Sequence, residues 1–388
     1  MIWNLIHLVD ILLWIFTAIS VGYVAFFAIA SLRHHHDIAT VDAEQRHFLV
    51  LIPAYHEDAV IINTARKFLL QDYPKQLYQL VVISDHMLPA TNEQLASLSL
   101  TLLTPTFQKS SKAKALKYAI DHIKSDTSFD RVVILDADNI VAPNFLRQLN
   151  AACASGHHAI QCHRTAKNSE NDIAVLDGVS EEINNTIFRR AHNNIHLSSA
   201  LIGSGMCFDY HWFCQNVGAL ESAVEDRELE ALLAMQNIYV KYEEDIHVMD
   251  EKVSSRDNFQ RQRMRWMTGQ VQTFFRMLPY LPKALRTGNI NYIDKHLQQM
   301  LIPRSVLLVF LPVYSILMTI IAQPWSLKWW VLFISFCLSL YIAIPKRLRN
   351  RAVFARLTAL PQLVWQMTIN LFHIDKNNTD FIHTNHDK

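Results

Sequence analysis

The sequence predicts an α/β protein with a mostly parallel sheet, attached to three membrane-spanning helices. Between residues 46 and 275, short apolar runs that end in polar or acidic residues alternate with helical patterns, as in βαβ units. Long segments almost free of charge lie on both sides of this region. The chain is 51% hydrophobic and only 18% charged, whereas a soluble domain is usually about a quarter charged. Part of the chain is therefore expected to contact lipid.

The first membrane segment is predicted within residues 1–35, as an N-terminal anchor. Asp10 is the only charged residue between Leu5 and Leu32. The charge-free stretch from Ile11 onward is long enough to cross about 30 Å of hydrocarbon at about 1.5 Å per residue. No basic stretch precedes it and no small-residue cleavage site follows, which favours an anchor over a removable signal.

Two further spans are predicted within residues 305–344. They are the apolar runs 305–322 and 329–344, with residues 323–328 expected to form a tight turn. Tryptophans beside this turn occur where interfacial aromatic residues are expected. Buried core helices of a soluble protein are the alternative interpretation, but they do not explain why all three runs have consistent basic flanks.

The basic flanks predict the orientation of the chain in the membrane. Arg33 follows the first span, Arg304 precedes the second, and residues 346–351 carry a basic cluster after the third. The positive-inside rule therefore predicts that the middle region and the C-terminal tail are cytoplasmic. Interfacial helices are expected at residues 276–304, and an amphipathic interfacial helix is expected within residues 345–374.

The α/β region, residues 46–275, contains apolar runs that predict parallel strands. These runs cover residues 47–54, 80–84 and 132–135, with helical patterns at 59–71 and 112–124 between them. Ligands of such sheets bind beyond the carboxyl ends of the strands. Polar residues with suitable chemistry follow these strand ends: Tyr55, Glu57, Asp85, Asp136 and Asp138.

Asp136 and Asp138 are separated by one residue directly after a strand-like run. Such a pair can hold one Mg²⁺ or Mn²⁺ whose shell is completed by substrate phosphate oxygens. The structural alternative is a helix N-cap formed by Asp138 or Asn139.

A net charge of +1 argues against a nucleic-acid partner. Glycine-rich phosphate loops and paired CxxC cysteines do not occur in the sequence.

Further motifs follow in order along the chain. They are Ile52-Pro53-Ala54-Tyr55-His56-Glu57, Asp85, Asp136-Ala137-Asp138, Gly203-Ser204-Gly205-Met206, Val224-Glu225-Asp226-Arg227-Glu228-Leu229 and Gln262-Arg263-Met264-Arg265-Trp266. With these motifs the chain resembles the inverting family 2 glycosyltransferases of the GT-A fold. It is most similar to the membrane-bound group that contains cellulose, chitin, hyaluronan and poly-N-acetylglucosamine synthases. One departure is His86-Met87, where that family usually has Gly-Ser after the acid.

The resemblance implies roles for individual residues. Asp226 is expected to be the general base that deprotonates the acceptor hydroxyl. Asp136 and Asp138 are expected to hold the metal that neutralises the leaving diphosphate. The donor site implied by the resemblance consists of Pro53, Tyr55, Glu57, Asp85, Lys114, Asp136, Asp138, Gln262, Arg265 and Thr384. The acceptor site implied by it consists of Gly205, Glu225 and Trp266.

Three of these assignments have structural alternatives. Lys114 belongs to a lysine group, with Lys109 and Lys112, in which a solvated helix start explains the charges equally well. Residues 262–266 also match a basic helix at a membrane surface with Trp266 as its anchor. Thr384 lies in a tail, residues 375–388, that resembles the gating loop of the cellulose synthases, and a disordered terminus is the alternative.

The predicted function is transfer of a sugar from a nucleoside diphosphate donor, UDP being the family's commonest nucleotide, to a glycan or lipid-linked acceptor. The expected location is the bacterial inner membrane, in envelope or exopolysaccharide synthesis. Three spans are fewer than the synthases use for a pore, so partner subunits for polymer export remain an option. The alternatives are a metal-dependent nucleotidyl- or phosphotransferase and a non-catalytic membrane scaffold.

Overall fold

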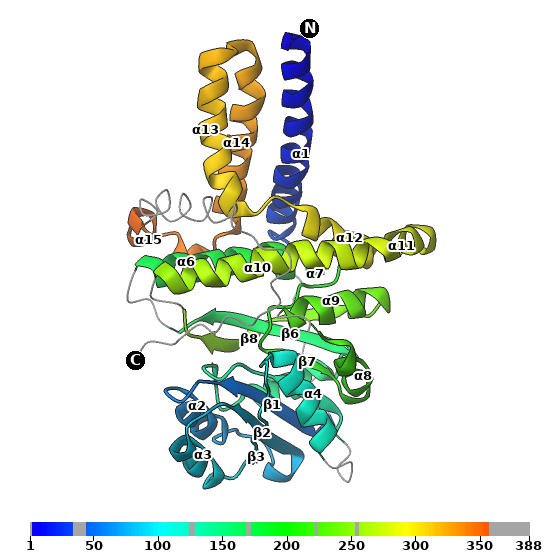
Figure 1. Ribbon diagram of the computed structural model, residues 1–388, viewed down its shortest axis with the longest axis vertical. Helices are drawn as coiled ribbons and strands as arrows, with labels where there is room; N and C mark the ends of the chain where they lie inside the picture. The colour runs from blue at the N-terminus through cyan, green and yellow to red at the C-terminus, as the bar shows by residue number, and fades with distance from the viewer. Residues whose placement is uncertain are drawn as a thin grey trace.

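The computed structural model describes residues 2–33, 44–123, 129–167, 172–221, 224–252 and 256–356. Figure 1 shows three tiers along the long axis of the molecule. Three long apolar helices project from one end, an α/β domain forms the other end, and a layer of helices lies between them. We call this middle tier the helical layer. The predicted α/β class and mostly parallel sheet are confirmed.

The α/β domain is organised around one eight-stranded sheet with the order β3-β2-β1-β4-β7-β6-β8-β5. β1 pairs in parallel with β2 and β4, and β2 pairs in parallel with β3. β7 runs antiparallel to both of its neighbours, β4 and β6. The strands are β1 (Phe48–Tyr55), β2 (Tyr78–Asp85), β3 (Thr101–Leu103), β4 (Arg131–Ile134), β5 (Ile140–Val141), β6 (Ala159–Ala166), β7 (Met206–Asp209) and β8 (Val240–Asp250).

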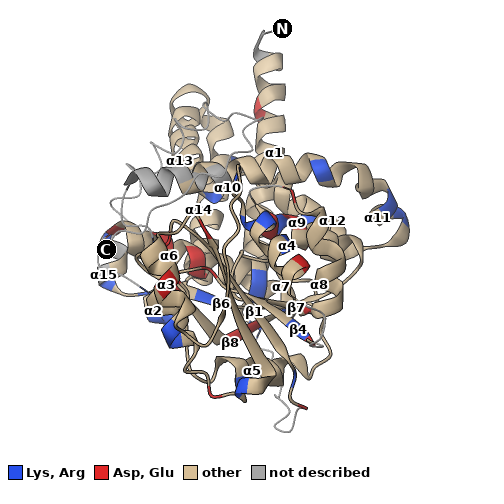
Figure 2. Ribbon diagram, turned by 60° about the horizontal axis from the view of Figure 1, so that its bottom comes forward, with Lys and Arg blue, Asp and Glu red and all other residues tan. Residues whose placement is uncertain are grey.

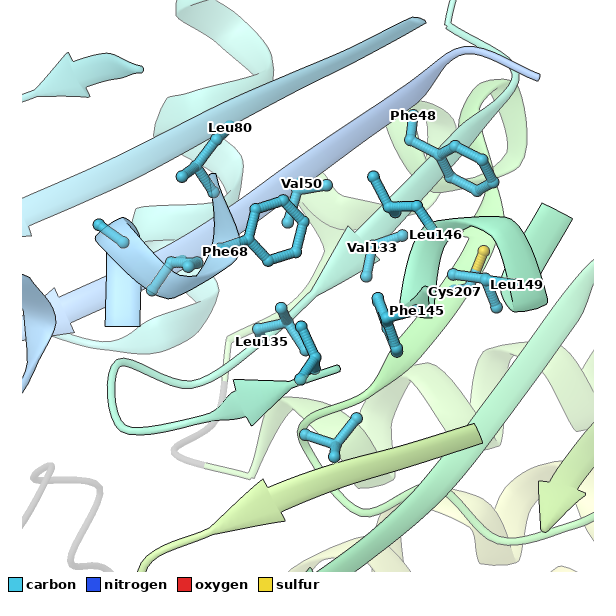
Figure 3. Packing of buried hydrophobic residues seen from close by; sticks show 14 of the residues in the cluster. Phe48, Val50, Phe68, Leu80, Val133, Leu135, Phe145, Leu146, Leu149 and Cys207 are labelled. Atoms are coloured by element: carbon cyan, nitrogen blue, oxygen red, sulfur yellow. The ribbon is translucent and has the colours of Figure 1, made fainter. Parts of the chain in front are cut away.

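The central strands are buried on both faces, which explains their uninterrupted apolar sequences. In β1, Phe48 and Val50 pack into one cluster, whereas Leu49 and Leu51 pack into another on the opposite face. Figure 3 shows part of the first cluster, in which side chains from β1, β2 and β4 meet Phe68 of α2 and Phe145 of α5.

Helices cover both faces of the sheet. On one face lie α2 (Ile61–Phe68), α3 (Pro89–Ala96) and α5 (Phe145–Cys153). On the other face lie α4 (Lys112–His122), α8 (Tyr210–Asn216) and α9 (Glu225–Met235). Short 3₁₀ turns are η1 (Lys75–Leu77) and η3 (Val217–Ala219). The predicted elements at 47–54, 59–71, 80–84, 112–124 and 132–135 correspond to β1, α2, β2, α4 and β4.

The helical layer connects the sheet to the apolar helices (Figure 1). It consists of α6 (Asp172–Asn184), the π-helical turn η2 (Asn185–Arg190), α7 (Ala191–Asn194), α10 (Arg256–Met277), η4 (Leu278–Tyr280), α11 (Leu281–Thr287) and α12 (Ile290–Met300). Within it, α12 makes polar contacts on two sides. Asp294 accepts a hydrogen bond from the Tyr23 hydroxyl of α1 at 2.7 Å. Gln299 accepts one from Arg227 of α9, also at 2.7 Å.

The apolar helices are α1 (Ile2–Ala30), α13 (Arg304–Ile321) and α14 (Gln323–Ala343). All three are long and apolar enough to cross a membrane, and α1 is almost uniformly tan in Figure 2 because Asp10 is its one charged residue. The Asp10 carboxylate contacts Lys328 and accepts a hydrogen bond from the Trp329 indole at 2.9 Å. These partners compensate a charge that would be costly inside lipid.

The tight turn predicted at residues 323–328 is wrong. α14 begins at Gln323, directly after Ala322, with Pro324 in its first turn. Proline is tolerated there because the first N–H groups of a helix lack intrahelical acceptors. After α14 come η5 (Lys346–Leu348) and α15 (Arg351–Arg356). The rest of the predicted amphipathic segment and the tail with Thr384 lie outside the described residues.

Candidate active site

The ends of β1 and β2 bring Tyr55 and Asp85 together. These two residues form the last pair of the parallel ladder, two positions after Pro53 pairs with Ile83. The Asp85 side chain is buried, and its Oδ1 is 2.6 Å from His86 Nδ1. Beyond β1, the Glu57 N–H donates to Met87 Sδ at 3.1 Å. The predicted nucleotide-site residues at these two strand ends therefore lie in one place.

Asp138 is held firmly at the end of β4. It is 3% exposed, and its Oδ2 accepts a hydrogen bond from the backbone N–H of Glu251 at 2.8 Å. Asn139 donates to Asp138 Oδ1 at 3.1 Å and to Asp250 Oδ1 at 3.2 Å. The N-cap alternative is wrong, because β5 follows these acids and the N-cap position of the next helix is Asn144.

Asp136 is more accessible than Asp138 and lies among cations. Its side chain is 32% exposed and contacts the Lys112 ammonium group. Arg164 Nη1 lies 4.0 Å from its Oδ2. Lys112 also donates to the backbone carbonyl of Gly203 at 2.6 Å and lies 3.3 Å from Glu225 Oε1. Burial lowers the pKa of Lys112, but the carboxylates of Asp136 and Glu225 outweigh it and hold the pKa above its ordinary value.

Lys112, rather than Lys114, is the lysine that reaches the acids. Lys114 is exposed, and its ammonium group donates to the Lys109 carbonyl at 2.6 Å. The sequence contained the signal for this difference. Lys112 occupies the same face of α4 as the buried residues Ala115, Leu116 and Ala119, which follow it at helical spacing.

The start of α9 adds Glu225 and Asp226 to the same group of side chains. A Cβ placed on Gly203 would lie 3.6 Å from Asp226 Oδ2 and 3.9 Å from Glu225 Oε1. Burial raises the pKa of Glu225 to about 6; Lys112 opposes this, and the nearby carboxylates of Asp226 and Asp136 reinforce it. Gly203 has a φ of +86°, so a side chain there would be strained as well as close to the acids.

Gly205, which the resemblance assigns to the acceptor site, lies where strands of the sheet approach each other closely. A Cβ at this position would lie 2.9 Å from Val248 and 3.3 Å from Cys162. Its backbone N–H donates to Ile134 and its carbonyl accepts from Cys162, both as sheet hydrogen bonds. Gly205 therefore allows close approach of strands, whereas Gly203 is the glycine that borders Asp226.

A buried charged network lies behind Asp136 and Asp138, and no sequence motif predicts it. Arg164 Nε is 2.6 Å from Glu181 Oε1 and 3.8 Å from Asp250 Oδ2. Lys252 Nζ is 2.7 Å from the same Asp250 oxygen and also contacts Glu181. Asn139 donates hydrogen bonds to both Asp250 and Asp138. The network therefore holds the Asp138 side chain in place.

Gln262, Arg265 and Trp266 lie in α10, which packs against the start of α9. A Cβ on Gly269 would lie 2.7 Å from Val224, the residue before Glu225. Arg265 is one helical turn before Gly269 in α10. Gln262 and Trp266 are half-buried, and the Gln262 side-chain oxygen is buried without a hydrogen-bond partner among the described residues. Buried polar atoms are normally paired, so this oxygen is a candidate contact for a bound ligand.

The family can now be identified. The sequence pattern of the glycosyltransferase like family 2 matches residues 45–269, more than half of the chain. The chain belongs to this family and is a glycosyltransferase. No curated protein sequence matches it.

The chain is also similar to several solved structures. The mannosyltransferase PcManGT from Pyrobaculum calidifontis is 17% identical, with a TM-score of 0.52 over 87% of this chain and 99% of that chain. TarS from S. aureus, residues 1–349, is 14% identical, with a TM-score of 0.44 over 84% of this chain and 88% of that chain. Glucosyl-3-phosphoglycerate synthase from Mycobacterium tuberculosis is 17% identical, with a TM-score of 0.42 over 62% of this chain and 84% of that chain.

Proposed function

We propose that this chain is a membrane-bound inverting glycosyltransferase that uses a nucleoside diphosphate sugar, with UDP as the nucleotide. The observation that carries the proposal is the meeting of Asp136, Lys112, Glu225 and Asp226, contributed by separate segments of the chain. Asp226 lies beside Gly203, whose carbonyl binds Lys112. Asp226, the proposed proton acceptor, and Lys112, which can neutralise phosphate charge, are therefore neighbours, as a transfer reaction requires.

The acids of the site fit a hard divalent ion, Mg²⁺ or Mn²⁺. No group of three or more His, Cys, Asp or Glu side chains forms a metal cluster within the described residues. Mg²⁺ typically takes one or two protein carboxylates and fills its shell with water and substrate phosphates, so Asp136 and Asp138 suffice. The PcManGT structure, which contains GDP-Man and Mn²⁺, supports this choice. When bound, such an ion neutralises charge on the departing diphosphate.

Lys112 is proposed to supply a fixed positive charge to the diphosphate. Its side chain is 15% exposed, so its charge is weakly screened and effective at short range. In the described site it is held by Asp136, Glu225 and the Gly203 carbonyl. Gln262 and Arg265 are proposed to approach the same phosphates from α10.

Asp226 is proposed to remove the proton from the acceptor hydroxyl. Its Oδ1 accepts a hydrogen bond from the backbone N–H of Arg227 at 2.8 Å, which orients the carboxylate. Its Oδ2 lies next to the side of Gly203 on which other residues carry a Cβ. One base and one displacement invert the anomeric centre and need no covalent carboxylate intermediate. Glu225 and Trp266 are proposed to position the acceptor.

The three apolar helices support a location in the bacterial inner membrane, with the sheet domain in the cytoplasm. The acceptor is then a glycan or a lipid-linked sugar at the membrane surface, as in envelope or exopolysaccharide synthesis. Lys283 and Arg286 of α11 accompany exposed Leu285, and Figure 2 shows blue segments, the colour of Lys and Arg, on this helix. This combination suits contact with anionic lipid.

The test is to supply purified protein with a panel of nucleotide sugars and Mn²⁺ or Mg²⁺, together with membrane lipid extract as acceptor. We expect one donor, a UDP-linked sugar, to release free nucleoside diphosphate. Asp226→Asn should lower turnover at least about 100-fold, since general bases contribute about 10²–10⁴, while UDP still binds by calorimetry. Release of nucleoside monophosphate or pyrophosphate, or full activity of Asp226→Asn, would contradict the proposal.

A further inference from the structure

The two strands that begin the nucleotide site both continue into a histidine with a left-handed backbone. His56 follows β1 with a φ of 54°, and His86 follows β2 with a φ of 55°. Residues with a Cβ avoid this region, so its use by a non-glycine residue indicates a constrained position. Because Tyr55 and Asp85 pair at the strand ends, the two histidines emerge side by side, with ring centroids 5.9 Å apart.

The turns after β1 and β2 are tied to each other. Glu57 N–H donates to Met87 Sδ at 3.1 Å, and Leu88 N–H donates to Asp58 Oδ1 at 2.9 Å. These hydrogen bonds run in opposite directions between the two turns. The histidines are therefore carried by one connected unit and not by two independent loops.

Asp85 determines which nitrogen of His86 carries the proton. Asp85 Oδ1 lies 2.6 Å from His86 Nδ1, the acid side chain being 5% exposed and the imidazole 38% exposed. An ionised carboxylate can only accept, so Nδ1 is the donor. In the neutral ring the remaining nitrogen, Nε2, is then an acceptor. The buried Asp85 carboxylate thus leaves Nε2 of the accessible His86 ring as a hydrogen-bond acceptor.

Flat aromatic surfaces surround this acceptor. The Tyr55 ring packs edge to face against His56, with centroids 4.4 Å apart, and against His86, with centroids 5.7 Å apart. His56 and His86 are exposed, and Tyr55 is half-buried. Rings that can stack on a base, next to a group that can read its edge, are the two requirements for recognising a nucleobase.

We propose that His86, oriented by Asp85, selects the base of the nucleotide donor. Its Nε2 accepts the ring N–H of uracil N3 or guanine N1, whereas the matching ring nitrogen of cytosine or adenine carries a lone pair and repels it. The inference rests on the proposed function, because it concerns the donor of that reaction. It adds a specificity residue at a position where the family usually has glycine.

Calorimetric binding of UDP, GDP, CDP and ADP to the full chain in detergent, with Mn²⁺ present, tests the proposal. The variant is His86→Gly, because glycine adopts a positive φ without strain and should leave folding intact. The matched control is His196→Gly, which replaces another histidine with a positive φ, 62°, outside the two turns. Thermal unfolding of all three proteins checks that each is folded.

We expect the wild-type protein to bind UDP or GDP at least about tenfold more tightly than CDP and ADP, because an unpaired acceptor at this site is costly. His86→Gly should lose about tenfold in affinity for the preferred nucleotide and little for the others. His196→Gly should bind all four nucleotides as the wild type does. If His86→Gly keeps the wild-type preference, or loses affinity equally for all four, the proposal is wrong while the proposed function stands. If the wild type binds none of them, both are wrong.

Discussion

Lys112 and Glu225 face each other at 3.3 Å, and the same ammonium group contacts Asp136. This lysine at the start of α4 therefore joins the acid after β4 to the acid at the start of α9, which is followed by Asp226. The donor and acceptor ends of the proposed reaction are connected through one side chain. Changes at Lys112 should affect both ends, and changes at the neighbouring lysines should affect neither.

Lys112→Met should lower kcat/KM for the donor by about 10- to 100-fold. The substitution removes charge-assisted hydrogen bonds worth about 1.5–3 kcal/mol, and about 1.4 kcal/mol corresponds to a factor of ten. Nucleotide release in steady state is the measurement. The matched control is Lys114→Met, whose ammonium group donates only to an exposed carbonyl in the described contacts. A larger loss in the Lys114 variant than in the Lys112 variant would contradict the assignment.

Glu225 should make the stability of the protein depend on pH between about 4.5 and 6. Burial raises the pKa of this carboxyl from 4.5 to about 6, so the folded state holds the proton more tightly than the unfolded state. The stabilisation is complete below the lower value and is lost as pH rises through the upper one. Glu225→Gln removes this dependence.

The measurement is the free energy of unfolding of both proteins across this pH range. The wild type should lose about 2 kcal/mol relative to Glu225→Gln between the two ends, at about 1.36 kcal/mol per pKa unit. A constant difference between the two proteins at all pH values would show that the carboxyl titrates normally.

Gly269→Ala should destabilise the contact between α10 and α9. Its Cβ would lie 2.7 Å from Val224 Cγ1, and overpacking of this kind costs about 1–3 kcal/mol. Displacement of Val224 would also move Glu225 and Asp226, so turnover should fall together with the unfolding temperature. Adding Val224→Ala should restore both. Gly218→Ala is the control, because nothing lies within 4 Å of a Cβ there.

The buried pair of Lys295 and Glu230 joins α12 to α9. Its Nζ–Oε1 distance is 3.4 Å, with side chains 1% and 8% exposed. Lys295→Met should cost about 3–5 kcal/mol in the free energy of unfolding, because it leaves a buried charge without its counter-ion. Adding Glu230→Gln should recover most of this loss, since the amide oxygen still accepts the Leu201 N–H that bonds Glu230 at 2.8 Å.

An exposed pair provides the comparison for this double-mutant cycle. Arg147 and Asp72 lie 2.7 Å apart with both side chains 63% exposed, so Arg147→Met should change stability by less than about 1 kcal/mol. Equal effects of the two substitutions in chemical unfolding would show that burial of the Lys295 pair is unimportant.

Helix α4 shows how far the sequence predicts the site. The sequence predicts this helix and its apolar face, and the resemblance implies Lys114 as the donor lysine, whereas Lys112 is the lysine that reaches the acids. The helical period places Lys112 in line with Ala115 and Leu116 and leaves Lys114 on the solvent side. The information was present in the spacing, although the purpose of a buried lysine becomes evident only when Asp136 and Glu225 are seen beside it.

The features that depend on neighbouring residues can be predicted without a structure: the apolar spans, the alternation of buried strands with amphipathic helices, and the presence of acids at strand ends. These follow from local periodicity and hydrophobicity, which every segment carries independently. Which residues share a site follows from the fold, as for Arg164 with Asp250 or Gly203 with Asp226. Those pairs are distant in sequence. They meet because β6 pairs with β8 in the sheet and because α9 packs on the sheet face beside β7.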